Sequence, residues 1–464
     1  MTLSPALLAI VYLISGCLFI LGLKGLTHPT TARRGNVFAI VGMAIAILAT
    51  LMDPAIASYG FIFAGIIVGG SIGTFIALKI KMTDMPQLVA ALHSFVGLAA
   101  VLVAIGTFLN HRTAGTLEPE LVIELGIGAF IGAITFTGSL IAFGKLQGLL
   151  SGNPVVFPYQ HHLNLGLGIL LLILTYSFYT THSLGVLVLL TLIALALGFL
   201  LIIPIGGADM PVVISMLNSY SGWAAAATGF TLNSKLLIIT GALVGFSGAI
   251  LSYIMCHAMN RSFISVILGG FGGDADGEES AFASAAEKGV KSASPDDAAF
   301  FMTNASKIII IPGYGMAMAQ AQHALKELSK TLEALDIEVK YAIHPVAGRM
   351  PGHMNVLLAE ADIPYDSVLE MDEINPEFAT TDVALVVGAN DITNPAAELD
   401  KTSPIYGMPI LQCSKAKQVF VIKRSMNTGY AGVDNLLYYM DNCSLVFGDA
   451  KEVVENLVLS IKES

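Results

Sequence analysis

The chain carries little charge. Only 12% of its 464 residues are Asp, Glu, Lys or Arg, whereas a soluble globular protein has roughly 25%. Hydrophobic residues make up 55%, and the mean hydropathy is +0.74. These values exclude an ordinary soluble protein and indicate a membrane protein. The formal net charge of -11 also argues against a nucleic-acid partner, which would require a basic surface.

Cysteine is scarce as well. The four cysteines (Cys17, Cys256, Cys413 and Cys443) are scattered without the spacing of a metal site or a disulfide framework. We therefore expect reduced thiols and no metal. The chain lacks a cationic segment before its first apolar stretch, and further apolar stretches follow, so we predict no cleaved signal peptide.

What the chain has instead is a series of long apolar segments. A spanning helix needs about 20 mainly apolar residues. Residues 1–262 contain nine such segments and predict a multi-span α-helical membrane bundle. The segments are Pro5–Leu23, Asn36–Met52, Ile56–Leu78, Gln87–Leu109, Leu121–Phe143, Leu163–Tyr179, Leu184–Ile203, Met210–Phe230 and Leu236–Met255.

The distribution of basic residues between the loops predicts the orientation. An odd number of spans places the two termini on opposite sides of the membrane. One set of loops contains only Arg112 and Lys235, whereas the other contains Lys24, Arg33, Arg34, Lys79, Lys81, Lys145 and Arg261. Because basic loops stay on the cytoplasmic side, we expect the N-terminus outside and the C-terminal region in the cytoplasm.

Glycines recur in these segments at a spacing that suits close helix packing. Gly65, Gly69 and Gly73 share one helix face, as do Gly128 with Gly132 and Gly241 with Gly245. Small residues four apart let helix backbones approach each other, so we expect a tight bundle. Glycines that face lipid are the alternative.

The composition changes after the last segment. Residues 263–304 include Gly-Gly-Phe-Gly-Gly-Asp-Ala-Asp-Gly-Glu-Glu-Ser, which indicates a flexible acidic linker. Residues 305–464 alternate strand and helix patterns and predict a doubly wound, Rossmann-like parallel sheet of about six strands. The expected strands are Ile308–Ile311, Glu338–Ile343, Ser367–Leu369, Ala384–Val387, Gln418–Ile422 and Ser444–Phe447, and a final helix is expected at Lys451–Lys462.

Several strand ends carry residues that suit a dinucleotide. Gly313 and Gly315 follow the first strand with Gly-x-Gly spacing, although the third position of that fingerprint is Met318. The second strand ends at His344 rather than at an acidic residue, which favours NADP over NAD. The sequence Lys423-Arg424-Ser425 offers two cations and a hydroxyl to a phosphate, with a solvated charge pair as the alternative.

Polar residues inside the predicted spans are costly and therefore informative. His93 lies within the fourth span and could exchange a proton near neutral pH, or it could be a neutral structural histidine. Ser215, Asn218, Ser219 and Gly222 form one face of the eighth span, and Thr135 and Ser139 lie one turn apart in the fifth. Asp209 precedes the eighth span and could equally be its N-cap. Polar faces of three spans that meet inside a helix bundle predict a proton path.

Long stretches of the chain are similar to the beta subunits of proton-translocating NAD(P) transhydrogenases. These stretches are Val89–Val101, 206–223, 258–264, Pro312–Gln322, His344–Met354 and Lys423–Gly432. The resemblance implies that hydride passes from NADH on a partner alpha subunit to NADP⁺ on this chain while a proton moves inward. It also implies a dimer of alpha-beta units in a bacterial cytoplasmic (inner) membrane.

The resemblance further implies roles for individual residues. His93, Ser139 and Asn218 would lie on the proton path, and Asp209 and Arg261 would couple it to the nucleotide domain. The residues expected to bind NADP(H) are Gly313, Tyr314, Gly315, Met316, Ala317, Val346, Ala347, Gly348, Arg349, Asn390, Asp391, Lys423, Arg424, Ser425, Gly429 and Tyr430. Gln87 and His257 depart from some members, which have a carboxylate and a lysine there.

A transporter or channel gated by a nucleotide-binding domain would share this two-part layout. Such a protein would carry a selectivity motif or a broken substrate-binding helix, and the sequence shows no clear filter. A soluble dehydrogenase with a passive anchor would not need nine spans.

Overall fold

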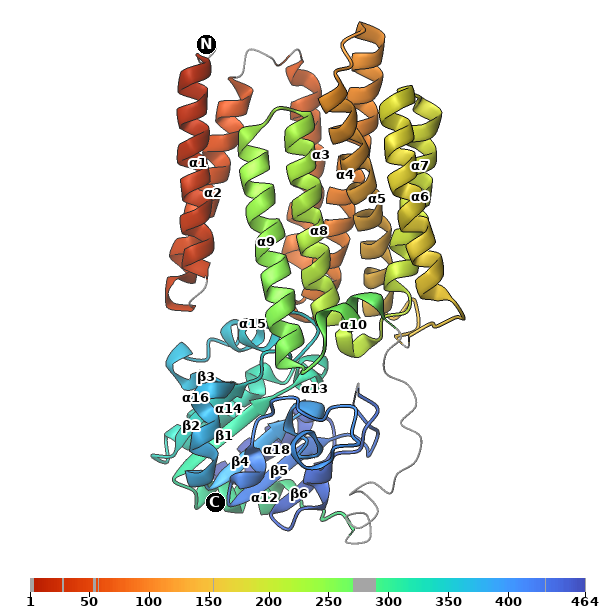
Figure 1. The fold of residues 1–464 in the computed structure, drawn as a ribbon. Coiled ribbons are helices and arrows are strands. Elements are labelled where there is room, and N and C mark those ends of the chain that lie inside the picture. The colour runs from red at the N-terminus through yellow and green to blue at the C-terminus, as the bar shows by residue number, and fades with distance from the viewer. Residues whose placement is uncertain are drawn as a thin grey trace. The chain divides into compact units, whose positions relative to one another are not determined.

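The computed structural model describes residues 4–26, 29–52, 56, 58–152, 154–269, 289–429 and 431–463. These residues form two compact units. The first comprises Met1–Gly144, Phe157–Ile202 and Met216–Ile250, and the second comprises Lys145–Val156, Ile203–Ser215 and Leu251–Ser464. Figure 1 shows the elements of both along the chain.

Each of the nine apolar segments forms a helix. The helices are α1 Pro5–Leu26, α2 Pro29–Leu51, α3 Tyr59–Lys79, α4 Met85–Ala114, α5 Pro119–Leu146, α6 Gln160–Thr181, α7 Leu184–Ile202, α8 Met210–Thr231 and α9 Lys235–Ala258. Within the described residues, eight helices are long and apolar enough to cross a membrane. Helix α8 is not among them, because its serines, threonines and Asn218 lower its hydropathy. The chain is therefore a multi-pass membrane protein.

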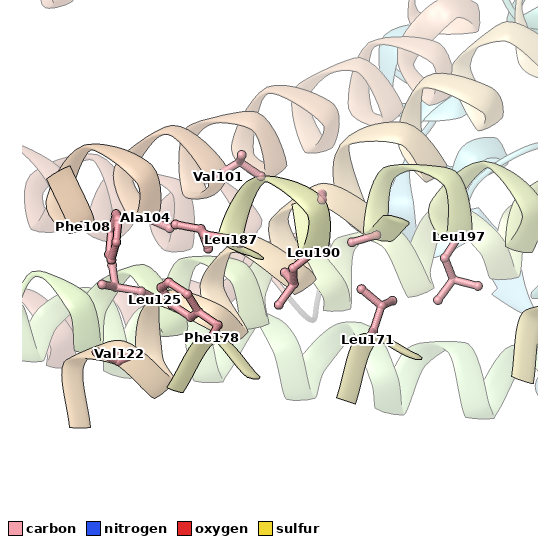
Figure 2. Close-up of a cluster of buried hydrophobic side chains, with 13 residues drawn as sticks. Val101, Ala104, Phe108, Val122, Leu125, Leu171, Phe178, Leu187, Leu190 and Leu197 are labelled. Carbon is pink, nitrogen blue, oxygen red and sulfur yellow. The ribbon is translucent and has the colours of Figure 1, made fainter. Parts of the chain in front are cut away.

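An apolar core joins helices α4 to α7 (Figure 2). Phe108 of α4 and Phe178 of α6 are fully buried, and their ring centroids lie 5.4 Å apart. Leu125 of α5 and Leu190 of α7 are also fully buried in this cluster. The cluster fixes α4 and α5, which carry His93 and Ser139.

Glycine contacts confirm close packing for some of the predicted faces. A Cβ on Gly132 would lie 2.7 Å from the Gly97 carbonyl oxygen, and one on Gly241 would lie 2.4 Å from the Ala226 nitrogen. The expectation is wrong for the face of Gly65, Gly69 and Gly73 on α3, where no described atom lies within 4 Å of such a Cβ. Helix α3 buries none of its residues within this single chain.

The second unit contains the predicted six-stranded parallel sheet. The strands are β1 Lys307–Pro312, β2 Glu338–Ile343, β3 Val368–Glu370, β4 Val383–Val387, β5 Gln418–Lys423 and β6 Cys443–Phe447. Their order is β3-β2-β1-β4-β5-β6, with Ile310 paired to Tyr341 on one side and to Leu385 on the other. Ile308–Ile311 are fully buried, as expected for a central strand that helices cover on both faces.

Helices precede, connect and follow the strands. They are α12 Pro295–Thr303, α13 Tyr314–Ala319, α14 Gln322–Glu333, α15 His353–Glu360, α16 Met371–Ile374, α17 Ala396–Leu399 and α18 Ala450–Glu463. The helix after β1 is interrupted at Gln320, which has a φ of 53°. The amides of Gln320 and Ala321 donate to the carbonyls of Ala317 and Met316, and this Schellman pair ends α13 after six residues.

The two ends of the predicted linker are structured. Phe263–Leu268 form helix α10, and Ser292 forms a parallel bridge with Leu445 at the edge of β6. Ser294 caps α12 through a capping box with Asp297. Residues 270–288, which include the acidic centre of the predicted linker, lie outside the described residues. The flexibility of the linker and the division of the chain into three regions therefore stay predictions.

Candidate functional site

Two glycine turns meet at the carboxyl ends of β1 and β4. The Gly313 amide donates to the Val387 carbonyl at 2.9 Å, and the Gly315 amide donates to the Gly388 carbonyl at 2.8 Å. A Cβ on Gly313 would lie 2.4 Å from the Gly388 oxygen, and Gly388 itself has a φ of 66°. The strand order reverses here, which is where ligands bind in doubly wound sheets. The glycines are therefore required by the contact between the two turns.

This contact uses the amides that a Gly-x-Gly turn would offer to a pyrophosphate. Gly313 and Gly315 donate across to the β4 turn, and Met316 donates to the Gly313 carbonyl at 3.1 Å. Met316 and Ala317 are fully buried and do not line the cavity described below. Three amides of this turn are thus already hydrogen-bonded within the protein, and the predicted contact of Gly313–Ala317 with NADP(H) stays a prediction.

We expect Gly313→Ala to destabilise the sheet domain by about 2–3 kcal/mol, the usual cost of overpacking against backbone that cannot move. Limited proteolysis over a temperature series would follow the unfolding of residues 289–463. Gly168→Ala on α6, where a Cβ meets nothing within 4 Å, is the control. Equal unfolding temperatures for Gly313→Ala and the wild type would contradict the packing argument.

A cavity of about 970 Å³ lies at this edge of the sheet in the second unit, within the usual size range of ligand sites. It brings together residues at the ends of five strands of the sheet, as well as Asp209 and Arg261. The predicted residues that line it are Gly313, Tyr314, Gly315, Val346, Ala347, Gly348, Asn390, Asp391, Lys423, Arg424, Ser425, Gly429, Asp209 and Arg261. Tyr430, the expected lid residue, lies outside the described residues.

Lys423 supplies the half-buried cation of the cavity. Its Nζ donates to the Tyr438 hydroxyl at 3.2 Å and lies 4.4 Å from the centroid of the same ring. Burial lowers the pKa of Lys423, and the carboxylates of Asp434 and Asp391 oppose that shift. Arg424 and Ser425 are exposed beside it, so the cavity has a positive edge.

Asn390 and Asp391 are held from behind the cavity. The Asn435 side-chain Nδ2 donates to the Asn390 Oδ1 at 3.1 Å, and the Tyr438 hydroxyl donates to the same atom at 2.9 Å. The Ala431 amide donates to the Asp391 Oδ2 at 3.0 Å. Sequence reasoning missed Asn435 and Tyr438, since they lie in and beside a 3-10 turn (Leu436–Tyr439) that matches no motif.

His344, where an acidic residue would mark an NAD site, is structural. It is 1% exposed; the Val346 amide donates to its Nδ1 at 3.2 Å, so its Nε2 carries the proton and donates to the Pro409 carbonyl at 2.8 Å. Burial lowers the pKa of His344 to about 4. A neutral His344 therefore fixes the start of the Val346–Gly348 loop without adding charge.

Arg349, a predicted NADP(H) contact, is not among the residues that line the cavity. Its amide donates to the His353 Nδ1 at 3.1 Å, its Nη1 donates to the Leu146 carbonyl at 2.8 Å, and its guanidinium lies 4.4 Å from the Tyr314 ring centroid. Burial and the Arg349 charge lower the pKa of His353 to about 4. Arg349 thus packs against cavity-lining Tyr314 rather than facing the cavity itself.

Asp209 and Arg261 form an ion pair of 3.1 Å. Asp209 ends the 3-10 turn Gly207–Asp209 and is 7% exposed. Burial raises the pKa of the Asp209 carboxyl, and the Arg261 charge opposes this shift. Nearby, Lys145 Nζ donates to the carbonyls of Ile203 and Ile205 at 2.7 Å each, which fixes the segment that leads to Asp209.

In the first unit His93 is paired with a serine that the sequence argument did not select. The His93 Nδ1 lies 3.0 Å from the Ser221 Oγ, and that Oγ donates to the Asn218 carbonyl at 2.8 Å. With the serine proton on the Asn218 carbonyl, the imidazole proton lies on Nδ1 and the lone pair on Nε2. Among the described residues, the buried Nε2 has no hydrogen-bond partner. It is the atom that can accept a proton.

The predicted polar stripe of α8 makes contacts with α9 and within α8 itself. Ser219 donates to the Gly245 carbonyl of α9 at 2.7 Å, and Gly222 packs against the same helix. Asn218 contributes its backbone carbonyl to Ser221. On α5 the fully buried Ser139 Oγ has no partner in the described part of the chain, and neither does the Gln87 Oε1 of α4. Buried polar groups of this kind are normally satisfied by water. His257 is exposed.

The fold and the site define a class. The chain is a multi-pass membrane protein that carries a doubly wound α/β domain with a cavity at the carboxyl edge of its sheet. A family model described as NAD(P) transhydrogenase beta subunit matches residues 8–460. Two relatives called NAD(P) transhydrogenase subunit beta, from Rhodospirillum rubrum and from a strain of that species, are each 59% identical over 452 residues. The match covers 96% of this chain and 97% of theirs. The chain belongs to the family of NAD(P) transhydrogenase beta subunits.

Proposed function

We propose that this chain binds NADP(H) in the cavity at its sheet edge and exchanges hydride with NAD(H) on an alpha subunit, coupled to proton movement across the membrane. The single observation that carries the proposal is the joint lining of one cavity by Lys423, Arg424 and Ser425. A lysine and an arginine side by side suit a phosphate, which NADP(H) has on its ribose and NAD(H) lacks.

The residues present fit NADP(H). Lys423, Arg424 and Ser425 would hold the 2′-phosphate, and the Val346–Gly348 loop, Asn390 and Gly429 would contact the rest of the nucleotide. When bound, the nicotinamide supplies the carbon that takes or gives the hydride. Direct transfer between two nicotinamides requires apposition and exclusion of water rather than an acid or base. The cavity residues are therefore binding and positioning groups.

His93 is the proposed proton carrier in the membrane unit. Its Nε2 lone pair accepts a proton, while the Ser221 hydroxyl holds the Nδ1 side of the ring. Ser139 and Asn218, on the neighbouring helices α5 and α8, would complete the path through water. The Asp209–Arg261 pair lies both at the start of α8 and on the cavity wall. It is thus placed to couple the path to nucleotide binding.

Proton movement across the membrane would supply the driving force that hydride transfer alone lacks. NADH and NADPH are nearly equal hydride donors, so transfer alone has little driving force. One proton that crosses ~150 mV releases roughly 3.5 kcal/mol, which shifts the nucleotide ratio by roughly a few hundred-fold. We further infer that the proton moves inward across a bacterial cytoplasmic membrane. In this membrane the N-terminus lies outside, the nucleotide domain lies in the cytoplasm, and the enzyme is a dimer of alpha-beta units.

The proposal is tested with the purified chain and its alpha partner in sealed vesicles. NADPH reduces an NAD analogue while a pH-sensitive dye reports proton movement. Stoichiometric proton movement that stops when the NAD analogue is withheld supports the proposal. Proton or solute flux that nucleotides merely open or close, without hydride transfer, would favour the nucleotide-gated transporter instead.

We expect Asp209→Asn to lower coupled transhydrogenation at least about tenfold, because it leaves the partly buried Arg261 charge without its carboxylate. The exchange Asp209→Arg with Arg261→Asp should restore part of that loss, since the pair is re-formed. The assay is the vesicle system above. Additive losses in the double variant would show that the two residues act separately.

A further inference from the structure

Tyr438 is a buried tyrosine that touches two walls of the candidate cavity without lining it. Its side chain is 2% exposed, and it is not among the residues that line the cavity. It lies on the 3-10 turn Leu436–Tyr439, which the fully buried Asn435 caps by accepting from the Leu437 amide at 3.0 Å. The ring is therefore held firmly before any ligand binds.

The direction of each hydrogen bond at the Tyr438 hydroxyl follows from the donors available. An ammonium group can only donate, so the hydroxyl oxygen accepts from Lys423 Nζ at 3.2 Å. Its single proton is then donated to the Asn390 Oδ1 at 2.9 Å. The result is a series of two directed hydrogen bonds, from Lys423 to Tyr438 and from Tyr438 to Asn390.

These hydrogen bonds also fix the orientation of the Asn390 side-chain amide. Its Oδ1 receives two donors, the Tyr438 hydroxyl and the Asn435 amide. The Asn390 Nδ2 therefore faces away from Tyr438 and toward Gly429. A Cβ added to Gly429 would lie 2.9 Å from this Nδ2. Gly429 and Asn390 both line the cavity. Asn390 accordingly presents an N–H donor on the same side as the Gly429 backbone.

We propose that Tyr438 is a positioning residue for NADP(H): its hydroxyl directs the Lys423 ammonium and the Asn390 amide donor into the cavity. The proposal rests on the proposed function. Tyr438 touches neither the nucleotide nor the reacting atoms, and it acts on affinity through these two side chains. Lys423 has three donors and uses one on Tyr438, so the others stay available to an anionic ligand.

The test is a mutant cycle on the full-length chain in complex with its alpha partner. Tyr438→Phe keeps the ring and removes the hydroxyl, and should weaken NADPH binding about tenfold, the scale of a lost hydrogen bond to a charged group. The transfer rate at saturating NADPH should stay within about twofold of the wild type, because the hydroxyl does not touch the reacting atoms. In a Lys423→Ala, Asn390→Ala background the same change should cost less than about twofold.

Tyr341→Phe is the matched control. Tyr341 is also a buried tyrosine, on β2, with its hydroxyl bonded to the Leu325 carbonyl at 3.2 Å, but it is not among the residues that line the cavity. It should lower thermal stability and leave NADPH affinity unchanged. An equal loss of affinity in both variants, or an undiminished Tyr438→Phe effect in the double-alanine background, overturns the positioning role.

Failure of the proposed function is separately visible. If the wild-type chain binds NADH and NADPH equally, the NADP(H) assignment and the role of Tyr438 fall together. If the wild type prefers NADPH and Tyr438→Phe binds it as tightly, only the role of Tyr438 falls.

Discussion

A chain with His93→Ala should lose nearly all coupled transhydrogenation and proton movement. Alanine has no group that can accept a proton where the His93 Nε2 lone pair now lies buried between helices. If protonation of His93 alters NADP(H) affinity, the bound nucleotide must alter the protonation of His93 by the same free energy. Removing the titrating group therefore removes both directions of coupling. The measurement is NADPH-driven reduction of an NAD analogue in sealed vesicles with a pH-sensitive dye.

Two further variants make the His93 result specific. Ser221→Ala keeps the imidazole and removes the hydroxyl that holds its Nδ1 side, so its activity should fall between the wild type and His93→Ala. His111→Ala changes a partly exposed histidine at the other end of α4, bonded to Thr116, and should behave as the wild type. A His93→Ala chain that moved protons at the wild-type ratio would make His93 a structural histidine.

The repeating patterns of the sequence predicted most of the fold. Each apolar run became a helix, and the strand at Glu338–Ile343 was predicted to the residue. The four isoleucines of β1 gave the simplest strand signal, because that strand is buried on both faces. The interruption at Gln320 was missed, since every residue around it favours helix and only a left-handed φ at Gln320 ends α13. The glycine face of α3 was misjudged, because spacing shows that a helix could pack closely and not whether this chain packs on it.

The candidate site was predictable where it lies at strand ends and unpredictable where it depends on contacts distant in sequence. Lys423 and Asn390 end β5 and follow β4, so the parallel sheet brings them to one edge. Tyr438 joins them across 15 and 48 residues, and Ser221 reaches His93 across 128. Neither contact leaves a periodic trace in the sequence. The Gly-x-Gly pattern was read for a ligand, whereas its amides bind the neighbouring turn.

The largest effect on binding is expected from Lys423→Ala combined with Arg424→Ala. The pair forms the positive edge of the cavity, and its loss should weaken NADPH binding by about 2–4 kcal/mol, the scale of charge-assisted contacts to a phosphate. That is roughly 30-fold to 1,000-fold in the dissociation constant. NADH lacks the 2′-phosphate, so its weaker binding should change little. Calorimetry on the full-length chain, purified without the alpha subunit, measures both nucleotides at one site.

Lys417→Ala is the control for the loss of positive charge itself. Lys417 precedes the other end of β5, where its exposed ammonium pairs with Asp382 at 2.7 Å. Its replacement by alanine lowers the net charge of the domain by one and leaves the lining of the cavity unchanged. NADPH affinity should stay within about twofold of the wild type, because exposed charges beyond about 10 Å are screened at ordinary salt. If the double variant lost NADH and NADPH binding to the same extent, Lys423 and Arg424 would serve the shared part of the nucleotides. The 2′-phosphate would then need another partner, and preference for NADP(H) would no longer rest on this edge of the sheet.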